Sequence, residues 1–440
     1  MKSRIIGPLA TLCLFATGLA PARAQVSPSP TPPPAAVVSA DLAKPFDPAA
    51  ATQAWLDTVP ADKRAKSDAY FEGGYWLILW NFLIGAAVSL FLLAARTSAR
   101  LRDWAERFTR FKTPQVILYA IPFTILTFLL GFPMELYQSY FREHAYGLSN
   151  QSFGLWLGDE GKGLFVALIA NALMFSALYA VFRRAPRLWW ALGTAVAVLL
   201  FMVGIMLAPV FVFPLFNKYQ PVIDAKIRDP ILALARANEI PVDQVYEFDA
   251  SRQTTRVSAN VSGFLGTTRI SLNDNLLKQC SLPEIRMVMS HEMGHFVLNH
   301  TMKLLSQLTI FVFVGFLFAR GTFDWAVRKW GNVWGVRGIA DPAGFPLLAL
   351  IFSLFVFVIT PLTNTVSRVT EREADAFGLN ASREADAMAQ GALKLGAYRK
   401  MNPGPIEEFI FYDHPSGRAR IRMAMDWKAA QLPAGGAPAK

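Results

Sequence analysis

Long apolar runs separated by polar stretches make up most of this chain. A helix needs about 20 apolar residues to cross the hydrocarbon core of a bilayer. Six runs suit this role, and the fifth is the shortest. The pattern predicts membrane-spanning helices near residues 75–95, 115–133, 163–182, 189–213, 304–319 and 345–362. We therefore expect a mainly α-helical protein that crosses the membrane several times.

A further apolar segment opens the chain and has the features of an export signal. Lys2 and Arg4 form a basic start, and residues 5–20 are apolar. Ala22 and Ala24 then form a small-x-small cleavage site. We expect either a cleaved signal peptide or an uncleaved membrane anchor.

Two polar stretches interrupt the apolar pattern, one before the fifth run and one after the sixth. Apolar spacing in the first stretch is typical of soluble secondary structure. It predicts a helix over 220–238 with Ile223, Ile227, Ile231, Leu232 and Leu234 on its buried side, a strand over 245–248, and a β-hairpin over 257–272 with Gly263 and Gly266 near its turn. The hairpin is either a structural element or an edge that pairs with an extended peptide.

A helix at the end of this stretch carries the clearest chemistry in the chain. Ser281 and Glu284 form a capping box, and Pro283 falls in the first turn, where it loses no hydrogen bond. His291 and His295 lie four residues apart on one helix face, with Cβ atoms about 5–6 Å apart. Two imidazoles at that separation can bind one zinc ion.

The residues between the two histidines fit a hydrolytic role. Glu292 is placed to take a proton from a zinc-bound water. Gly294 costs about 1 kcal/mol of helix stability relative to Ala, but it lets another backbone approach the metal. The chain has only five histidines in 440 residues, so an ordinary amphipathic helix would rarely show this pattern by chance.

A catalytic zinc site also needs a third protein ligand and one open position. Glu371 and Glu373, which follow the sixth apolar run, can both supply that ligand by spacing alone. Asp375 lies one turn beyond Glu371 and can orient a ligand histidine through its ring N–H. His300 is nine residues beyond His291, which on a continuous helix turns it about 180° away from the metal. We expect it at the surface or behind a ligand.

Composition and charge agree with a membrane protein. Hydrophobic residues make up 53% and charged residues 17%, against about 25% charged in soluble domains. The net charge of +11 does not indicate nucleic-acid binding, because the cations gather beside apolar runs. The first, third and fifth loops are rich in cations, the fifth through Arg320, Arg328, Lys329 and Arg337. The positive-inside rule places these loops in the cytoplasm. Residues 214–303 and the C-terminus then face the periplasm of a bacterial inner membrane.

Residues 291–303 and 367–377 resemble the integral-membrane zinc proteases of the type I CAAX prenyl protease group. Residues 214–219 and the pair His414-Pro415 fit the same family, and the likeness runs from about residue 70 to 428. The resemblance implies a ring of transmembrane helices around a large water-filled chamber. It also implies a zincin-like catalytic domain that contains a small β-hairpin or sheet.

The resemblance further assigns roles to residues. It implies one Zn²⁺ per chain bound by His291, His295 and Glu371, in preference to Glu373, with Glu292 as catalytic base and Asp375 behind the ligands. His414 and Arg420 match positions that help stabilise the reacting carbonyl. The substrate strand corresponds to Ser258, Ala259, Asn260 and Val261, where the family usually has Asn-Ala-aromatic. This departure affects side-chain selectivity and leaves backbone pairing intact.

Together these features predict a membrane-embedded zinc metalloendopeptidase that acts on membrane-associated or lipidated, CAAX-like peptides. The expected partners are peptide or protein substrates and the bilayer. Alternatives are a stress-type membrane quality-control zinc protease and a non-catalytic membrane peptide-binding protein, which would not need Glu292. The expected divisions are 1–24 (signal or anchor), 25–74 (Pro-rich spacer and surface segment), 75–213 (four spans), 214–303 (zinc-protease domain), 304–362 (two spans), 363–428 (second catalytic part) and 429–440 (disordered tail).

Overall fold

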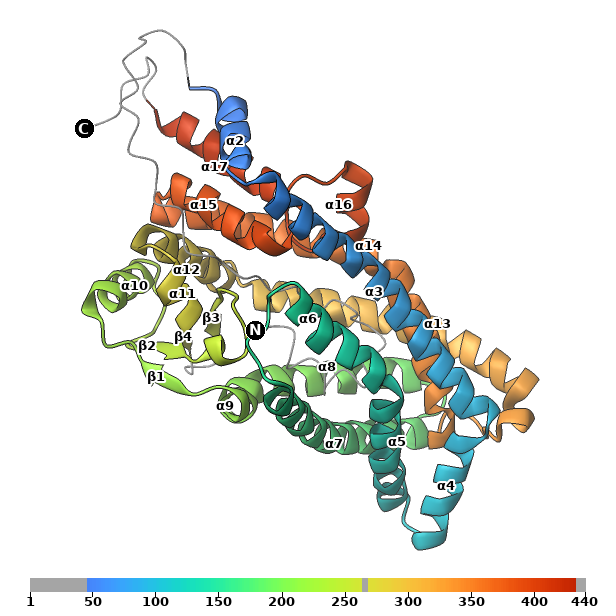
Figure 1. Ribbon diagram of the computed structural model, residues 1–440. Coiled ribbons are helices and arrows are strands. Elements are labelled where there is room, and N and C mark those ends of the chain that lie inside the picture. Colours follow the sequence, from blue (N-terminus) through green and yellow to red (C-terminus); the bar gives the residue numbers. More distant parts are fainter. Residues whose placement is uncertain (1–45, 263–267, 433–440) are drawn as a thin grey trace.

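The computed structural model describes residues 46–262 and 268–432 (Figure 1). The expected signal or anchor, residues 25–45 of the expected spacer and surface segment, and Gly263 and Gly266 of the hairpin turn lie outside these residues. The last helix, α17 (Gly417–Gln431), includes part of the expected disordered tail, so that prediction began the tail too early. Ala429 and Ala430 continue the helix because alanine has the highest helix propensity.

Six helical segments in the described residues are long and apolar enough to cross a membrane, which confirms the expected number. They are α3 (Ala61–Ala94), the run α5 (Lys112–Glu135), η1 (Leu136–Phe141) and α6 (Arg142–Ala145), α7 (Phe153–Arg184), the run α8 (Trp189–Leu207), η2 (Ala208–Val212) and α9 (Phe213–Phe216), α13 (His300–Trp334), and η4 (Pro342–Gly344) with α14 (Phe345–Ser382). The 34 residues of α3 span about 51 Å, against a hydrocarbon core about 30 Å thick. The ends of the long helices therefore project beyond the apolar layer.

These helices extend further into polar sequence than the apolar pattern predicts. α3 begins within the expected spacer. α13 continues to Trp334, so Arg320, Arg328 and Lys329 lie on this helix and not in a loop, contrary to the prediction. Gly335 ends the helix with a φ of +71°, a conformation that glycine adopts without a steric penalty. Backbone hydrogen bonds let a helix continue through polar residues once it has left the apolar layer.

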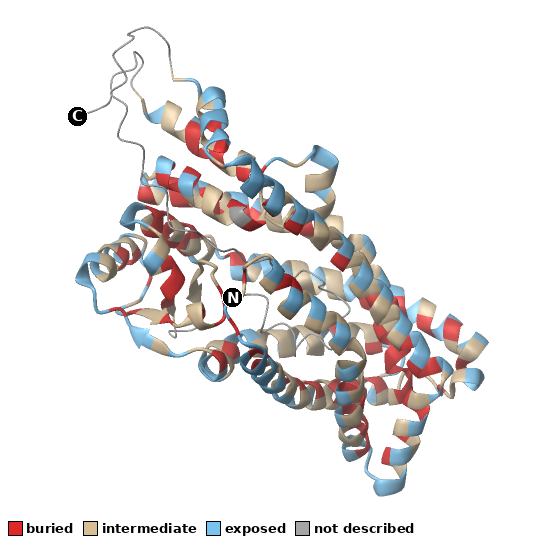
Figure 2. Cartoon of the chain, viewed as in Figure 1, coloured by how far each residue is buried: buried red, intermediate tan, exposed pale blue. Residues whose placement is uncertain are grey.

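Aromatic side chains fill the core of the bundle where the helices meet. Phe175 of α7 is fully buried, and its ring centroid lies 4.3 Å from that of Phe345 at the start of α14. Phe123 of α5 lies 5.4 Å from Phe345. Figure 2 shows buried positions where the helices face one another, and exposed and half-buried positions on their outer faces. Many exposed positions are large apolar residues, which is typical of surfaces in contact with lipid.

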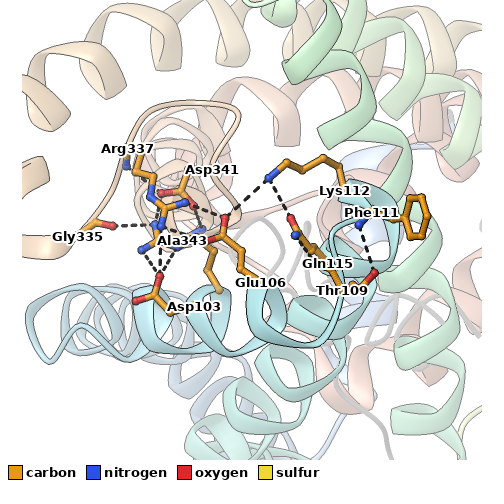
Figure 3. A network of polar contacts seen from close by, with 11 residues as sticks. Asp103, Glu106, Thr109, Phe111, Lys112, Gln115, Gly335, Arg337, Asp341 and Ala343 are labelled. Carbon is orange, nitrogen blue, oxygen red and sulfur yellow. Dashed lines mark hydrogen bonds and ion pairs between the residues drawn. The ribbon is translucent and has the colours of Figure 1, made fainter.

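At the end of the bundle away from the sheet, α4 (Thr97–Phe108) joins α3 to α5 (Figure 1). Arg102 is buried and donates hydrogen bonds to Asp341 and to Asp103. Arg337 forms an ion pair with Glu106 at 2.8 Å. We call these five residues the α4 clasp (Figure 3). The clasp fixes α4 to the connection between α13 and α14.

A small mixed sheet of four strands lies beside the bundle, in the order β1-β2-β4-β3. Its strands are β1 (Tyr219–Pro221), β2 (Val245–Phe248), β3 (Ala259–Ser262) and β4 (Arg269–Asn273). β2 and β4 pair in parallel, whereas the other two pairs are antiparallel. β2 confirms the predicted strand, and β3 with β4 confirms the predicted hairpin. β3 is an edge strand of this sheet.

The helix expected over 220–238 is shorter than predicted. α10 covers Ala225–Ala237, because residues 219–221 belong to the sheet. Asp224 caps the helix by accepting a hydrogen bond from the backbone N–H of Lys226 at 2.9 Å. Ile223 therefore precedes the helix and is 88% exposed, contrary to the expected burial, whereas Ile231 is fully buried.

The inner face of the sheet packs on the helix that contains the two nearby histidines. Ile270 and Leu272 of β4 share a buried cluster with Ile231 of α10 and with Ile285 and Met289 of α12 (Leu282–Val297). The short elements η3 (Ala250–Arg252) and α11 (Asp274–Gln279) follow β2 and β4. This packing sets the position of α12 relative to β3.

A second buried cluster brings together segments that are far apart in the sequence. Leu56 of α2 (Pro48–Asp57) packs with Met388 of α15 (Ala385–Leu395) and Ile421 of α17. The remaining elements are η5 (Gly396–Tyr398) and α16 (Pro405–Phe411). Two expected divisions, at 303/304 and 362/363, fall inside α13 and α14. The polar and membrane parts of the chain therefore share continuous helices.

Candidate metal centre

The N-terminal end of α12 is fixed by the capping box expected from the sequence. The backbone N–H of Ser281 donates to Glu284 Oε2 at 2.7 Å, and Pro283 occupies the first turn. From this fixed start, the helix carries His291 and His295 on one face, with their Nε2 atoms 3.2 Å apart. The spacing of four residues thus produces the pair of facing imidazoles that the sequence predicted.

The third side chain comes from α14, which packs closely against α12. A Cβ atom added to Gly378 would lie 3.1 Å from the backbone nitrogen of His291 and 2.7 Å from Met287 Cε. The close backbone approach thus occurs at Gly378 and not at Gly294, where it was expected. Gly294 instead accommodates the side chain of Phe377, whose Cδ1 atom would lie 3.0 Å from an added Cβ.

This close packing brings Glu371 to the two histidines. Its Oε2 atom lies 3.3 Å from His291 Nε2, and its Oε1 atom lies 3.7 Å from His295 Nε2. One ligand atom from each of the three residues lies within 4.8 Å of the other two. Two imidazole nitrogens and one carboxylate oxygen match the His₂Glu donor set of catalytic zinc sites. The residues therefore fit a divalent metal ion.

Glu373 has a different position, although spacing alone made it an equal candidate. Its Oε2 atom lies 3.0 Å from His300 Nε2 and 2.6 Å from Lys303 Nζ. These two contacts hold its carboxylate on the side of His295 that faces away from Glu371. The geometry thus favours Glu371 as the third ligand.

The Nδ1 atoms of both candidate ligand histidines have polar partners. His291 Nδ1 lies 2.8 Å from Asp375 Oδ1, and His295 Nδ1 lies 2.9 Å from His300 Nδ1. Partners of this kind fix the tautomer and orientation of a ligand imidazole. They direct the Nε2 atoms of both rings toward Glu371.

His300 lies behind the candidate ligand His295, which is one of the two positions predicted for it, although the reason differs. The prediction assumed one continuous helix, but α12 ends at Val297, and Asn299 adopts a left-handed conformation with a φ of +54°. Asn tolerates this conformation better than other residues with a Cβ atom. The break turns His300 back toward His295 and leaves it only 1% exposed. The asparagine at position 299 was the sequence signal of a helix break, which the assumption of one continuous helix did not take into account.

Buried carboxylates give the centre a strong preference for positive charge. Burial alone would lower the pKa of His291. The hydrogen bonds and charges of Asp375 and Glu371 outweigh burial and raise this pKa to about 10. Arg420 also donates a hydrogen bond to Asp375, and the charge of Asp375 outweighs burial and raises the pKa of Arg420. Carboxylates that attract a proton this strongly also attract a metal cation.

His414 also contacts the candidate metal centre. Its Nε2 atom is 3.4 Å from Glu371 Oε2, and its Nδ1 atom is 2.8 Å from Asp413 Oδ1. Nothing in the sequence analysis pointed to Asp413, which becomes recognisable only from its contact with His414. Arg420 reaches the centre from α17 through Asp375, on the side of His291 away from Glu371.

Glu292 lies on α12, and the expected substrate strand lies at the edge of the sheet that contacts this helix. Glu292 is half-buried on α12, next to His291. Asn260 and Val261 pair with Ser271 and Ile270 of β4, and β3 contacts α12. Ser258 directly precedes the strand, with its backbone N–H donating to Asn273 Oδ1 at 3.0 Å. β3 thus presents an edge beside the helix that carries the candidate ligands.

Comparisons with known proteins agree with this geometry. Residues 221–428 match the family model of peptidase family M48, and residues 48–218 match the CAAX prenyl protease N-terminal model, described as five membrane helices. The described residues contain four candidate spans in that second range.

Individual relatives match most of the chain. An uncharacterized metalloprotease, YhfN of Bacillus subtilis, is 28% identical over 349 residues, which cover 78% of this chain and 82% of that protein. CAAX prenyl protease 1 of Saccharomyces cerevisiae is 28% identical over 327 residues, covering 69% and 70% of the two chains. The crystal structure of S. mikatae Ste24p superposes with a TM-score of 0.70 at 20% identity, covering 86% of this chain and 94% of that one. The fold is therefore shared with Ste24p.

Proposed function

This chain belongs to peptidase family M48, the membrane metalloproteases, and from that premise we propose that it is a zinc metalloendopeptidase acting on membrane-associated or lipidated, CAAX-like peptides. One observation carries the proposal. Ligand atoms of His291, His295 and Glu371, from two helices separated by a membrane span, lie within 4.8 Å of one another, and Glu292 is on the same helix as the two histidines. A non-catalytic peptide-binding protein would need neither the donor set nor the adjacent carboxylate.

His291, His295 and Glu371 would hold one zinc ion, with Asp375 and His300 fixing the two imidazoles. When bound, zinc would polarise the substrate carbonyl and lower the pKa of the attacking water toward about 7. The orientation of the two imidazoles supports the fit of these residues to zinc. His291 Nδ1 contacts Asp375 at 2.8 Å and His295 Nδ1 contacts His300 at 2.9 Å, which leaves both Nε2 atoms for the metal.

Glu292 would act as the catalytic base. Its carboxylate would accept a proton from the attacking water and deliver it to the nitrogen of the leaving amine. His414 would donate a hydrogen bond from Nε2 to the carbonyl oxygen as that oxygen gains charge, an effect of about 3–4 kcal/mol per donor. Arg420 would assist from behind Asp375, as a further positive charge near the centre.

β3 would hold the substrate in an extended conformation. A peptide that adds to the edge at Ala259, Asn260 and Val261 would form main-chain hydrogen bonds, as strands do when they extend a sheet. Ser258 would stay fixed to Asn273 and set the start of the edge. Backbone pairing of this kind accepts varied side chains, which fits a protease for membrane-associated peptides.

Sidedness and division of the chain are further parts of the proposal. We place this multi-pass protein in a bacterial inner membrane with the centre on the periplasmic side, because cations dominate the opposite ends of the spans. Residues 214–303 and 363–428 would form one catalytic unit, and residues 75–213 and 304–362 would form the membrane unit. Reporter fusions test the proposed sidedness. A periplasm-dependent reporter should be active after Lys218 and inactive after Trp330, and the reverse pattern would exclude a periplasmic metal centre.

The decisive experiment compares Glu292→Gln with the unchanged protein after purification. We expect the variant to retain one zinc per chain and to lose nearly all cleavage of a membrane-associated test peptide, because only the base is removed. Glu247→Gln is the matched control, since Glu247 lies on β2 and contacts Gln220. It should cleave normally. Undiminished cleavage by Glu292→Gln would remove Glu292 from the mechanism, and cleavage that survives chelation would exclude a metal-dependent reaction. The same peptide with and without a lipid group tests the substrate class separately.

A further inference from the structure

The outer face of α4 carries a stripe of alternating cationic and aromatic residues. Positions 100, 104, 107 and 108 recur at helical spacing, so they share one side of the helix. All four are exposed, and residues 110 and 111 extend the set into the turn before α5. We call this set the α4 stripe; it consists of Arg100, Trp104, Arg107, Phe108, Arg110 and Phe111.

The aromatic members of the α4 stripe are unusually open to the surroundings. Trp104 is 41% exposed, Phe108 is 66% exposed and Phe111 is 62% exposed. The rings of Trp104 and Phe108 contact each other with centroids 4.8 Å apart, and the Arg110 guanidinium lies 5.3 Å from the centre of the Phe111 ring. A soluble surface rarely groups large exposed rings in this way, because their contact with water is unfavourable.

The acidic residues of α4 pair with cations outside the α4 stripe. Asp103 and Glu106, the acidic residues of this helix, both pair with Arg337 or Arg102 in the α4 clasp (Figure 3). In contrast, Arg100 and Arg107 take part in no ion pair within the described residues. The clasp therefore holds α4 in one orientation, and its ion pairs engage Asp103 and Glu106 with Arg102 and Arg337 and not with the arginines of the α4 stripe.

The position of α4 explains why its aromatic rings are exposed and why its outer arginines form no ion pair in the part of the chain that the structure describes. α3 ends at Ala94 and α5 begins at Lys112, so α4 joins two membrane spans and lies at the surface of the bilayer. It lies at the end of the bundle away from the sheet (Figure 1). Aromatic rings favour the boundary between headgroups and acyl chains, and arginine extends its guanidinium to the phosphates.

From these observations we propose that the α4 stripe binds anionic phospholipid headgroups in the leaflet opposite the metal centre. The three aromatic rings enter the level of the glycerol groups, and the guanidinium groups of Arg100, Arg107 and Arg110 bind lipid phosphates. A free inorganic anion would use the arginines alone and would leave the rings in water. A lipid satisfies both parts of the stripe, which is why the geometry favours it.

Titration of lipid into the full-length protein in a mild non-ionic detergent tests this, with the midpoint of thermal unfolding as readout. The probes are phosphatidylglycerol and phosphatidylcholine with identical acyl chains. We expect phosphatidylglycerol to raise the midpoint at lower concentration, and high salt to remove this preference, because the attraction is electrostatic. The triple variant R100Q/R107Q/R110Q should require about 100-fold more phosphatidylglycerol, since each cation near an anionic surface contributes about fivefold.

The control is the triple variant K63Q/K66Q/K226Q, which removes the same charge from exposed positions elsewhere on the protein. It should respond to phosphatidylglycerol as the unchanged protein does. Equal stabilisation of the unchanged protein by both lipids would overturn the proposal even if the stripe variant failed to fold. Inorganic phosphate that reproduces the shift would reassign the arginines to a free anion. A larger assembly that depends on the stripe, with no response to lipid, would reassign the surface to a protein contact.

Discussion

Two glutamates separated by one residue on α14 have different surroundings, and those surroundings decide their chemistry. Glu371 is 5% exposed and faces both histidines of α12. The side chain of Glu373 is 42% exposed and contacts His300 and Lys303. Each residue of a helix turns by about 100°, so positions two apart point to different sides. Only Glu371 can therefore reach a metal held by the histidine pair.

We expect Glu371→Gln to lose bound zinc and Glu373→Gln to keep it. The first change replaces a charged ligand with a neutral amide and should weaken zinc binding by more than about 100-fold. This loss exceeds the usual effect of removing a residue that only hydrogen-bonds to a metal ligand. The second should change zinc affinity by less than about tenfold, because His300 retains its contact with His295. Competition with a coloured chelator measures both affinities. Equal loss in the two variants would contradict the assignment, and the identical substitution makes each the control for the other.

At this scale the sequence predicted what depends on local spacing and missed what depends on a neighbouring helix. His291, Glu292 and His295 share a short helical motif, so their relation follows from helix geometry alone. The choice between Glu371 and Glu373 depends on how α14 packs on α12, which spacing cannot supply. His300 lies behind His295, one of the two positions predicted, but its direction was not predictable, because one left-handed residue, Asn299, changes the direction of the chain.

At the scale of elements, α12, β2 and the β3–β4 hairpin were predictable because strong local signals mark them. A capping box begins α12, and a β-branched or alternating pattern identifies the strands. The starts of α3 and α10 were not predictable in the same way. Residues 219–221, which precede α10, pair with β2. This pairing is a tertiary contact that the local sequence does not indicate.

One buried contact joins α6 to the segment that leads into β3. Glu143 of α6 is 6% exposed; it accepts a hydrogen bond from Tyr70 Oη at 2.7 Å and pairs with Arg256 Nη2 at 3.0 Å. The backbone oxygen of Arg256 accepts a hydrogen bond from Asn273 Nδ2 at 2.6 Å. Arg256 lies two residues before Ser258. The membrane helices and the edge strand are thus held together at this point.

We expect Glu143→Gln to weaken substrate binding without removing zinc. Loss of one partner of a buried ion pair costs about 3–5 kcal/mol, and the segment before β3 should become less ordered. KM for the test peptide should rise several-fold, whereas kcat should fall less and zinc content should remain at one per chain. Steady-state kinetics with metal analysis measures the three quantities. Lys278→Gln, which removes a more exposed partner of Asp274, is the control. A fall in kcat alone would show that the contact does not act through the edge strand.

At the scale of the whole molecule, the centre depends on parts of the chain that lie far apart. α12 packs on the sheet, α14 belongs to the helix bundle, and α13 crosses the membrane between them. α2 near the start of the described chain packs with α15 and α17 near its end. Hydropathy predicted the number of spans, because each must cover the same apolar thickness. It gave no information on these long-range contacts, since many arrangements bury the same apolar faces.

Because the candidate ligands link α12 to α14, we expect removal of zinc to destabilise the whole protein. A ligand that binds only the folded state stabilises it by about 2.7 kcal/mol at a concentration 100 times its Kd. Chelation should therefore lower the thermal unfolding midpoint of the unchanged protein and of Glu292→Gln by similar amounts, and added zinc should restore both. The double variant H291A/H295A should unfold at a low temperature that no longer responds to either treatment, because it lacks two of the three ligands. A response of this variant equal to that of the unchanged protein would mean that zinc acts at another place. An unchanged midpoint in all three proteins would mean that the metal does not join the two helices.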